Sequence, residues 1–291
     1  MKVTKAVIPA AGLGTRMLPI ARAVPKEMLP IVDKPAMAYL VEEAVGAGCT
    51  DILIITARGK GEIEDYFDYS PEYEARFLAK GKPEEIEKMR EICNKANVHF
   101  IRQHEAKGLG AAIRCAKPFT GNEPFLVLYG DDIIRSEKKP PSLELVECFE
   151  KYGKGVCGVS HVALDQIGKY CSLDAKPIEG TKAYNVYSMI EKPKPEQVIT
   201  DLAILGRVLL VPEIYDILDE TPLGAGHELQ LTDAMRTLAQ TKGMIATEYD
   251  GVRYDLGSKL GFLMANVEYA VHHPEVKDDF IKYIKEFASK L

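Results

Sequence analysis

The first 130 residues alternate between two hydrophobic periods, and this alternation restricts the possible folds more than any other feature of the chain. Between apolar runs at 6–11 and 52–55, apolar residues recur every three or four positions, as on one face of an α-helix (Met37, Leu40, Val41, Ala44 and Val45). Further apolar runs of strand length follow at 98–101 and 125–129. Consecutive strands that are separated by a helix pair in parallel through a right-handed crossover. We therefore predict an α/β fold with a Rossmann-like, mixed but mostly parallel central sheet flanked by helices.

The rest of the chain has a less regular pattern. Strand candidates lie at 156–162, 184–190, 202–211 and 244–249, and helix candidates lie at 212–218, 228–240, 262–271 and 276–287. The charged stretch 60–97 predicts surface helices over a sheet edge, and a further helix is expected from near Gly110 to just before Pro118. We expect a single domain over 1–291 with sub-regions 1–150 and 151–291, the second of which ends in helices. Whether one sheet continues across residue 150 stays open.

Composition and charge exclude several classes of function. Lys and Arg number 37 against 43 Asp and Glu, for a net charge of −6. The chain therefore lacks the positive charge typical of proteins that bind duplex nucleic acid or anionic membranes. No run of about 18 apolar residues predicts a membrane span, and the first residues lack the pattern of a signal peptide. The six cysteines include no C-x-x-C pair, so we expect a reduced cytoplasmic protein with no nucleic-acid or membrane partner.

A glycine-rich loop with the sequence AAGLGTR follows the first apolar run, at 10–16. In an open α/β sheet, ligands bind in the loops beyond the carboxyl ends of the strands. Gly12 and Gly14 permit close approach of the backbone, whose N–H groups can bind phosphates, and the Arg16 guanidinium suits phosphate oxygens. A dinucleotide-binding loop of the form G-x-G-x-x-G is an alternative, but Met17 stands where its third glycine should be.

The sequence PKEMLP at 25–30 holds Lys26 between two prolines, a few residues beyond this loop. A single lysine is most often a solvated surface residue. Here the prolines restrict the backbone, and the neighbouring loop has the features of a phosphate site. We therefore predict that Lys26 contributes a positive charge to that site.

These two motifs resemble those of the nucleotidyltransferases that make nucleotide sugars, and within them the prokaryotic UTP–glucose-1-phosphate uridylyltransferase family. The resemblance continues in the same order along nearly the whole chain, through segments at 32–35, 102–103, 107–110, 130–132, 191–193, 202–207, 230–234 and 254–257. Several motifs in one order are far more specific than one glycine-rich loop. The resemblance implies the nucleotide-diphospho-sugar transferase type of fold, with a nucleotide-binding half at 1–150 and a sugar-phosphate-binding half at 151–291.

The resemblance also implies roles for individual residues. The nucleotide would be bound by two loops, in which Gln103 reads the uracil edge and Gly108 packs close to the base; the set is Ala11, Gly12, Gly14, Thr15, Gln103 and Gly108. An amide suits a base edge because it has both a donor and an acceptor. Asp131 and Asp255 would hold Mg²⁺, the implied cofactor, together with phosphate oxygens. Asp132 is less favoured than Asp131, because adjacent side chains on an extended segment point to opposite faces.

The second half would bind the sugar phosphate, through Cys171, Glu191, Lys192 and Gly206. Glu191 would accept hydrogen bonds from glucose hydroxyls, and Lys192 would bind the phosphate. The chain departs from the family at one of these positions, since the family usually has Tyr-Gly-Val where this sequence has Tyr170-Cys171-Ser172. A side chain at Cys171 intrudes where the family has only backbone, so the identity of the sugar stays open.

The implied reaction is in-line attack by a phosphate oxygen of glucose 1-phosphate on the α-phosphorus of UTP, which gives UDP-glucose and pyrophosphate. Two polyanions must meet in it, so Arg16, Lys26 and Lys192 are the expected catalytic residues and act through their charge together with Mg²⁺. The attacking phosphate is already ionised and needs no general base. The family also implies a homodimer or homotetramer.

Three alternatives stay open. A related enzyme could use dTTP, as a thymidylyltransferase does, or a different sugar 1-phosphate. A non-catalytic nucleotide-sugar sensor would be expected to lack Arg16, Lys26 or Asp131, all of which are present. A nicotinamide-dependent oxidoreductase is disfavoured by Met17.

Overall fold

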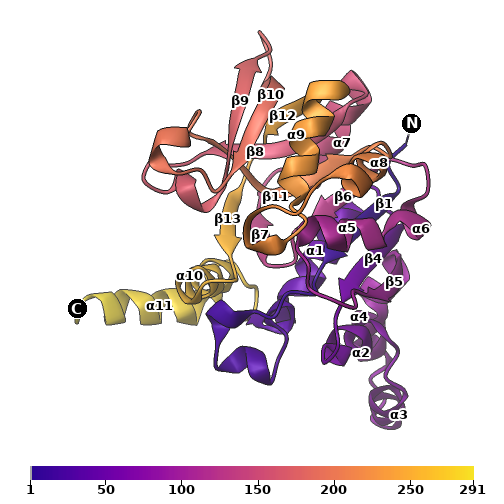
Figure 1. The fold of residues 1–291 in the computed structure, drawn as a ribbon. Coiled ribbons are helices and arrows are strands. Elements are labelled where there is room, and N and C mark those ends of the chain that lie inside the picture. Colours follow the sequence, from indigo (N-terminus) through magenta and orange to yellow (C-terminus); the bar gives the residue numbers. More distant parts are fainter. Residues whose placement is uncertain (1) are drawn as a thin grey trace.

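A nine-stranded mixed sheet forms the centre of the structure, a computed structural model that describes residues 2–291, apart from the side chains of Ile92 and Ala225 (Figure 1). The strands follow the order β5-β4-β1-β6-β11-β8-β12-β10-β9 across it. They are β1 (Lys5–Pro9), β4 (Asp51–Thr56), β5 (Asn97–Arg102), β6 (Phe125–Leu128), β8 (Gly155–His161), β9 (Cys171–Pro177), β10 (Ala183–Glu191), β11 (Leu202–Leu210) and β12 (Met244–Glu248). Two short antiparallel ribbons lie outside it, β2 (Pro30–Ile31) with β3 (Lys34–Pro35), and β7 (Asp132–Arg135) with β13 (Val252–Asp255).

Pairing within the sheet changes from parallel to mixed near its middle. Strands β5, β4, β1 and β6 are parallel, as expected of strand–helix–strand units. Strand β11 lies antiparallel between β6 and β8, while β12 runs parallel to β8 and antiparallel to β10. The predicted α/β class with a mixed central sheet is confirmed, although antiparallel pairing takes a larger share than "mostly parallel" implied. Because β11 pairs with β6, one sheet continues across residue 150.

Helices cover both faces of this sheet. The helices of the structure are α1 (Ala36–Gly46), α2 (Gly61–Phe67), α3 (Pro71–Ala79), α4 (Pro83–Lys95), α5 (Leu109–Cys115), α6 (Lys117–Thr120), α7 (Pro141–Tyr152), α8 (Ile214–Glu220), α9 (Leu231–Thr241), α10 (Lys259–Ala270) and α11 (Lys277–Ala288). Helices α1 and α7 contribute to one hydrophobic core, and α5, α8 and α9 contribute to the other. The charged segment 60–97 forms helices near the β5 edge as predicted, with α4 in contact with β5.

Two buried faces explain the hydrophobic pattern of the first half. In β1, Ala6 and Ile8 belong to the core beneath α1 and α7, whereas Val7 belongs to the core beneath α5. Successive side chains of a strand point to opposite faces, so a strand that is covered on both sides has no polar face. The continuous apolar runs at 6–11 and 52–55 therefore predicted the strands correctly.

Several elements were not predicted from the sequence, namely β7, β9, β13 and α7. The helix expected at 228–240 begins only at Leu231. The residues before it lie against the turn at 107–110, where the Leu229 N–H donates to the Lys107 carbonyl (2.8 Å) and the Gly110 N–H donates to the Leu229 carbonyl (2.9 Å). Throughout residues 2–291, each helix is too short or too polar to cross a lipid bilayer.

Candidate active site

Loops at the carboxyl ends of β1 and β6 approach each other closely and form one wall of the candidate site. The glycine-rich loop follows β1, and the turn at 129–131 follows β6. A Cβ on Gly130 would lie 2.5 Å from the Pro9 carbonyl oxygen, so only glycine permits this approach. Lys26, in a single 3₁₀ turn (Lys26–Met28) just before Pro30, then reaches Asp131, with 2.6 Å between Nζ and Oδ2.

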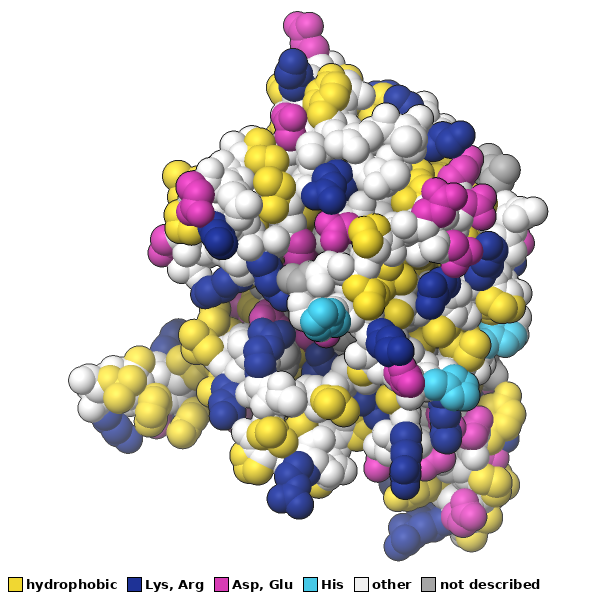
Figure 2. Space-filling model, viewed as in Figure 1, with side chains coloured by type: hydrophobic (Ala, Val, Ile, Leu, Met, Phe, Trp, Pro, Cys, Tyr) yellow, Lys and Arg dark blue, Asp and Glu magenta, His cyan; other side chains and the backbone are white. Residues whose placement is uncertain are grey.

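The larger of two cavities here has a volume of about 570 Å³ and contains Asp131. It opens on the face seen in Figure 2, where Lys and Arg side chains gather around a hollow. The cavity brings together every predicted metal and sugar-phosphate residue, and Arg16 as well: Arg16, Asp131, Cys171, Glu191, Lys192, Gly206 and Asp255. These residues come from positions up to 239 apart in the chain, and the fold places them around one space.

A smaller cavity of about 240 Å³ contains Lys26 and holds most of the predicted nucleotide residues, namely Ala11, Gly12, Gln103 and Gly108. Two others lie outside it. Gly14 adopts a left-handed backbone (φ 67°) and faces the stem of Lys26, since a Cβ there would lie 3.4 Å from Lys26 Cδ. Thr15 is exposed at the start of the next turn. The Lys26–Asp131 ion pair thus joins the two cavities.

Position 108 must be glycine because a distant segment of the chain packs directly against it. At φ 95°, a Cβ on it would lie 2.7 Å from the Leu229 carbonyl oxygen and 2.8 Å from the Glu228 side chain. The buried Gln103 points its amide at this turn, with 3.5 Å between Nε2 and the Gly108 carbonyl. The close approach places the 228–230 segment beside the smaller cavity.

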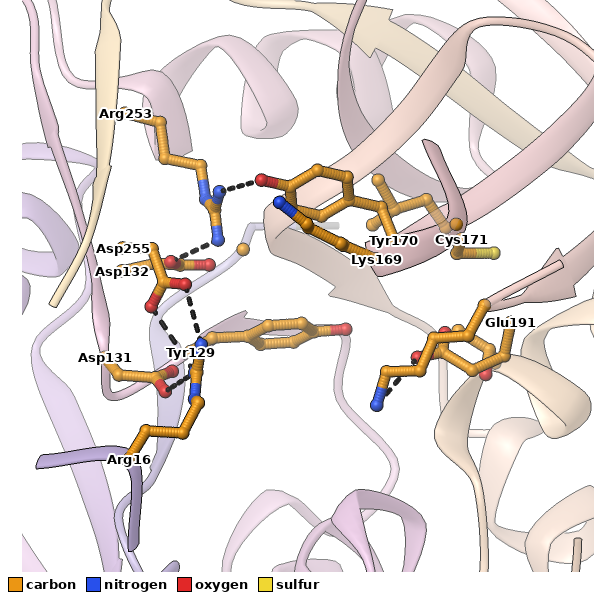
Figure 3. Close-up of a pocket in the computed structure, with 15 residues that line it drawn as sticks. Arg16, Tyr129, Asp131, Asp132, Lys169, Tyr170, Cys171, Glu191, Arg253 and Asp255 are labelled. Atoms are coloured by element: carbon orange, nitrogen blue, oxygen red, sulfur yellow. Dashed lines mark hydrogen bonds and ion pairs between the residues drawn. The ribbon is translucent and has the colours of Figure 1, made fainter. Parts of the chain in front are cut away.

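Arg16 and two carboxylates form a chain of contacts in the larger cavity (Figure 3), and the chain continues to Lys26 in the smaller cavity. Arg16 lies 2.9 Å from Asp255 and 3.5 Å from Asp131, which also contacts Lys26. Although burial alone would raise the pKa of Asp131, the charge and hydrogen bond of Lys26 hold that pKa below its ordinary value. Conversely, burial would lower the pKa of the Lys26 amine, but the negative charges of Asp131 and Glu27 together raise it. Lys26 is therefore fully charged at neutral pH.

Asp132 contacts a different cation from its neighbour Asp131. Its Oδ1 accepts a hydrogen bond of 2.5 Å from Arg253, whose guanidinium also reaches the Tyr170 hydroxyl at 3.4 Å (Figure 3). Burial raises the pKa of Asp132 to about 6, and Arg253 opposes that rise. The sequence analysis missed Arg253. It shares a strand face with Asp255, two residues along β13, so a prediction of that strand would have found it.

Gly206 fits against Asp132 and cannot carry a side chain. Its φ is 70°, and a Cβ would lie 2.6 Å from Asp132 Oδ2. The next residue, Arg207, is fully buried and holds this corner of the cavity, because it donates to the carbonyls of Gly206 and Asp132, both at 2.9 Å. Its charge is balanced by Glu43 of α1, through two hydrogen bonds of 2.8 and 2.7 Å.

A second buried ion pair supports the Lys26 turn. Lys60 lies 2.9 Å from both carboxylate oxygens of Glu27 and also contacts the Ala10 carbonyl. Glu27 is 1% exposed, and burial raises its pKa. Lys60 therefore ties the glycine-rich loop to the segment that presents Lys26. No period or motif in the sequence distinguishes Lys60 from a surface lysine.

Glu191 and Lys192 lie at the end of β10, with Glu191 across the cavity from Asp131 (Figure 3). Burial raises the pKa of Glu191. Lys192 has a left-handed backbone (φ 45°), which is uncommon for a residue with a side chain and concentrates at functional sites. Cys171 begins β9 opposite Glu191 and is 3% exposed, so its sulfur adds little to the cavity surface.

The donor set suits a magnesium ion. Asp131 and Asp255 both contact the Arg16 guanidinium, and the Leu256 N–H donates to the Asp131 carbonyl (2.8 Å), so the two carboxylates converge at one end of the β7–β13 ribbon. Mg²⁺ binds through one or two carboxylates and takes its other ligands from phosphate and water. Among residues 2–291 there is no cluster of three or more His, Cys, Asp or Glu side chains arranged for a metal.

The chain is similar in sequence and in structure to known nucleotidyltransferases. Residues 5–271 match the family model described as nucleotidyl transferase. The chain is 46% identical to the UTP–glucose-1-phosphate uridylyltransferase of Bacillus subtilis (strain 168), over 99% of this chain and 98% of that one. A structure of UDP-glucose pyrophosphorylase complexed with UDP-glucose has a TM-score of 0.84 at 41% identity and covers 92% of this chain and 98% of its own. A UTP-bound UGPase from Acinetobacter baumannii has a TM-score of 0.91 at 33% identity, over 98% and 99% of the two chains.

Proposed function

Because this chain belongs to the nucleotidyl transferase family, and its relatives over nearly their full length are UTP–glucose-1-phosphate uridylyltransferases, we propose the same reaction for it. The protein transfers a uridylyl group from UTP to glucose 1-phosphate and yields UDP-glucose and pyrophosphate. One observation in the structure carries this conclusion: the Lys26–Asp131 ion pair joins a cavity with the nucleotide residues to a cavity with the sugar-phosphate residues.

The two cavities divide the substrates between the halves of the chain. In this proposal the nucleoside of UTP occupies the smaller cavity, where Ala11 and Gly12 line the floor and the Gln103 amide faces the uracil edge. Glucose 1-phosphate occupies the larger cavity, near Glu191 and Lys192. The triphosphate then extends from one cavity into the other past Lys26, which places the α-phosphorus between them.

The chain's own residues serve the transfer by positioning and by charge. Lys26 is held by Asp131 in a fixed place between the two cavities, where it faces the phosphates of both substrates. Arg16 is 61% exposed, so its guanidinium can leave the carboxylates and follow the departing pyrophosphate. Lys192 binds the phosphate of the attacking sugar. That phosphate is ionised at neutral pH, so the reaction takes place without a general base.

We propose Mg²⁺ as the divalent cofactor, held by Asp131 and Asp255. When bound it neutralises charge on the phosphate oxygens. Without a bound metal ion, Lys26 and Arg16 form ion pairs with these carboxylates. These ion pairs offset the repulsion between the two negative charges.

Release of pyrophosphate from UTP tests the proposal. We expect release to require UTP, glucose 1-phosphate and Mg²⁺ together, and to fall to background when EDTA removes the metal ion. Substituting dTTP for UTP, or galactose 1-phosphate for glucose 1-phosphate, should lower kcat/KM by about a hundredfold or more, since a site built to hydrogen-bond its substrate rejects analogues strongly. Equal efficiency with dTTP, or release without a sugar phosphate, would contradict the proposed substrates.

We also propose that the protein forms a homodimer or homotetramer in which α11 of one copy pairs antiparallel with α11 of another. This helix projects from the body of the molecule (Figures 1 and 2). It carries the stacked rings of Phe280, Tyr283 and Phe287, two of them half exposed. Acidic residues occupy its first turn and Lys285 its last, so antiparallel pairing sets opposite charges together. Sedimentation equilibrium should show an oligomer that Phe287→Glu shifts toward monomer; a monomeric wild type would refute the pairing.

A further inference from the structure

Arg253 joins two walls of the larger cavity that belong to different parts of the fold. Its guanidinium donates to the Asp132 carboxylate (2.5 Å) on one side and to the Tyr170 hydroxyl (3.4 Å) on the other, and it lies 5.2 Å from the centre of the Tyr170 ring (Figure 3). Asp132 begins β7 of the β7–β13 ribbon, whereas Tyr170 directly precedes β9 of the main sheet. The Arg253 side chain therefore links the ribbon to the sheet across the cavity.

Both partners of Arg253 adjoin residues that act on phosphate in the proposed function. Asp132 directly follows Asp131, the proposed metal ligand. Tyr170 is bound to Lys192 through the backbone, since the Lys192 N–H donates to the Tyr170 carbonyl at 2.8 Å. A continuous series of contacts thus runs from the metal side of the cavity to the lysine on its sugar-phosphate side.

Lys192 depends on its backbone for its position in the cavity. A left-handed backbone (φ 45°) is costly for a residue with a side chain and persists only where the surroundings hold it. The side chain is 70% exposed and lies 4.0 Å from the Glu191 carboxylate, a loose contact. The segment 168–170 supports this turn a second time, because Gly168 packs closely on it: a Cβ there would lie 3.3 Å from the Pro193 carbonyl oxygen.

The Asp132 end of the link is fixed by the protein core. Asp132 is buried, and most of the Arg253 side chain is buried with it. Gly206 packs against the Asp132 carboxylate, and the buried Arg207 donates to the Asp132 carbonyl (2.9 Å). Arg253 is thus held firmly on the metal side, so its contact with Tyr170 restrains the segment that carries Tyr170.

We propose that Arg253 is a positioning residue that acts through Tyr170 and holds Lys192 at the separation from Asp131 that the transfer requires. This inference rests on the proposed function. In-line attack needs the sugar phosphate, bound by Lys192, to face the α-phosphorus near Asp131, and a misplacement of about 1 Å can cost about a hundredfold in rate. Arg253 touches neither substrate in this proposal.

Arg253→Lys tests the link, because its single amine can balance the charge of Asp132 but lacks the planar fork that also reaches Tyr170. We expect kcat/KM for glucose 1-phosphate to fall about a hundredfold, through a lower kcat and a higher KM. The dissociation constant of UTP, measured by calorimetry, should stay that of wild type, since neither residue lines the smaller cavity.

Tyr170→Leu shows whether Arg253 acts through Tyr170. It keeps an apolar side chain for packing and removes the ring and the hydroxyl that Arg253 contacts. We expect the same loss of kcat/KM as in Arg253→Lys. The combined variant should be no worse than either single one, because both substitutions break the same link. Additive losses would mean that Arg253 acts independently of Tyr170, and the proposal would be wrong.

A double substitution separates positioning from charge balance. Arg253→Met leaves the buried Asp132 carboxylate unpaired and should lower the melting temperature, whereas Arg253→Met with Asp132→Asn removes both charges and should recover it. If Arg253 served only to balance Asp132, the double variant would regain the wild-type kcat/KM. We expect it to keep the defect with glucose 1-phosphate, at an unchanged Mg²⁺ concentration for half-maximal rate; a changed Mg²⁺ requirement would place the defect at the metal and overturn the inference.

Arg135→Lys is the matched control, because Arg135 lies on the same ribbon but outside the cavity, where it pairs with Glu137 (3.3 Å) and Glu268 (3.6 Å). It should leave kcat, KM and the UTP dissociation constant unchanged. Wild-type kinetics in Arg253→Lys, or a weaker binding of UTP equal to the loss with glucose 1-phosphate, would contradict the positioning role. Failure of the wild type to make UDP-glucose would instead reject the proposed function.

Discussion

Lys26→Ala is expected to lower kcat by about a thousandfold or more while the protein stays folded. The reason is the position of the amine, which lies 2.6 Å from Asp131 at the junction of the two cavities. Its charge is placed where the phosphates of both substrates must approach, and preorganised charge of this kind contributes several kcal/mol to lowering a barrier. Single-turnover release of pyrophosphate measures the loss, and circular dichroism checks the fold.

Lys34→Ala provides the control for this experiment. Lys34 also pairs with a carboxylate, that of Glu42 at 2.5 Å, and its side chain is 29% exposed against 15% for Lys26. It lines neither of the two cavities of the candidate site. We expect Lys34→Ala to keep near-normal kcat. If Lys26→Ala also kept it, the proposed charge stabilisation by Lys26 would be wrong.

The largest loss of stability is expected from Glu43→Gln. Arg207 is completely buried, and Glu43 is the only acidic side chain to which it hydrogen-bonds within residues 2–291. The substitution preserves the shape of the side chain but leaves the guanidinium charge unbalanced in the core. Breaking a buried ion pair in this way costs about 3–5 kcal/mol in the free energy of unfolding. Urea denaturation at constant m-value would measure it.

Glu74→Gln is the matched comparison for Glu43→Gln. Arg90 and Glu74 form the same two-bonded arrangement, at 2.7 and 2.6 Å, but on the surface of α3 and α4. Water solvates the arginine there when the carboxylate is lost, so the change in stability should be much smaller. Equal losses in the two variants would show that burial does not set the strength of the Arg207–Glu43 pair.

The sequence by itself determined the architecture of the first half and the identity of most candidate residues. Strands such as β1 and β4 are buried on both faces, so their apolar runs are visible without a structure. Arg16, Lys26 and Asp131 follow or neighbour such strands in short motifs, and local order along the chain is enough to find them. Their division into two cavities was not visible in the sequence.

Only the tertiary structure decided which of these residues meet and what holds them in place. Arg253 and Lys60 act through partners from distant parts of the chain, Asp132 for the first and Glu27 for the second. Strands β7 and β13 are too short to give a period of their own, so their pairing is stabilised by the fold around them. Contacts between distant segments form only when the whole core is packed, and for that reason no local pattern records them.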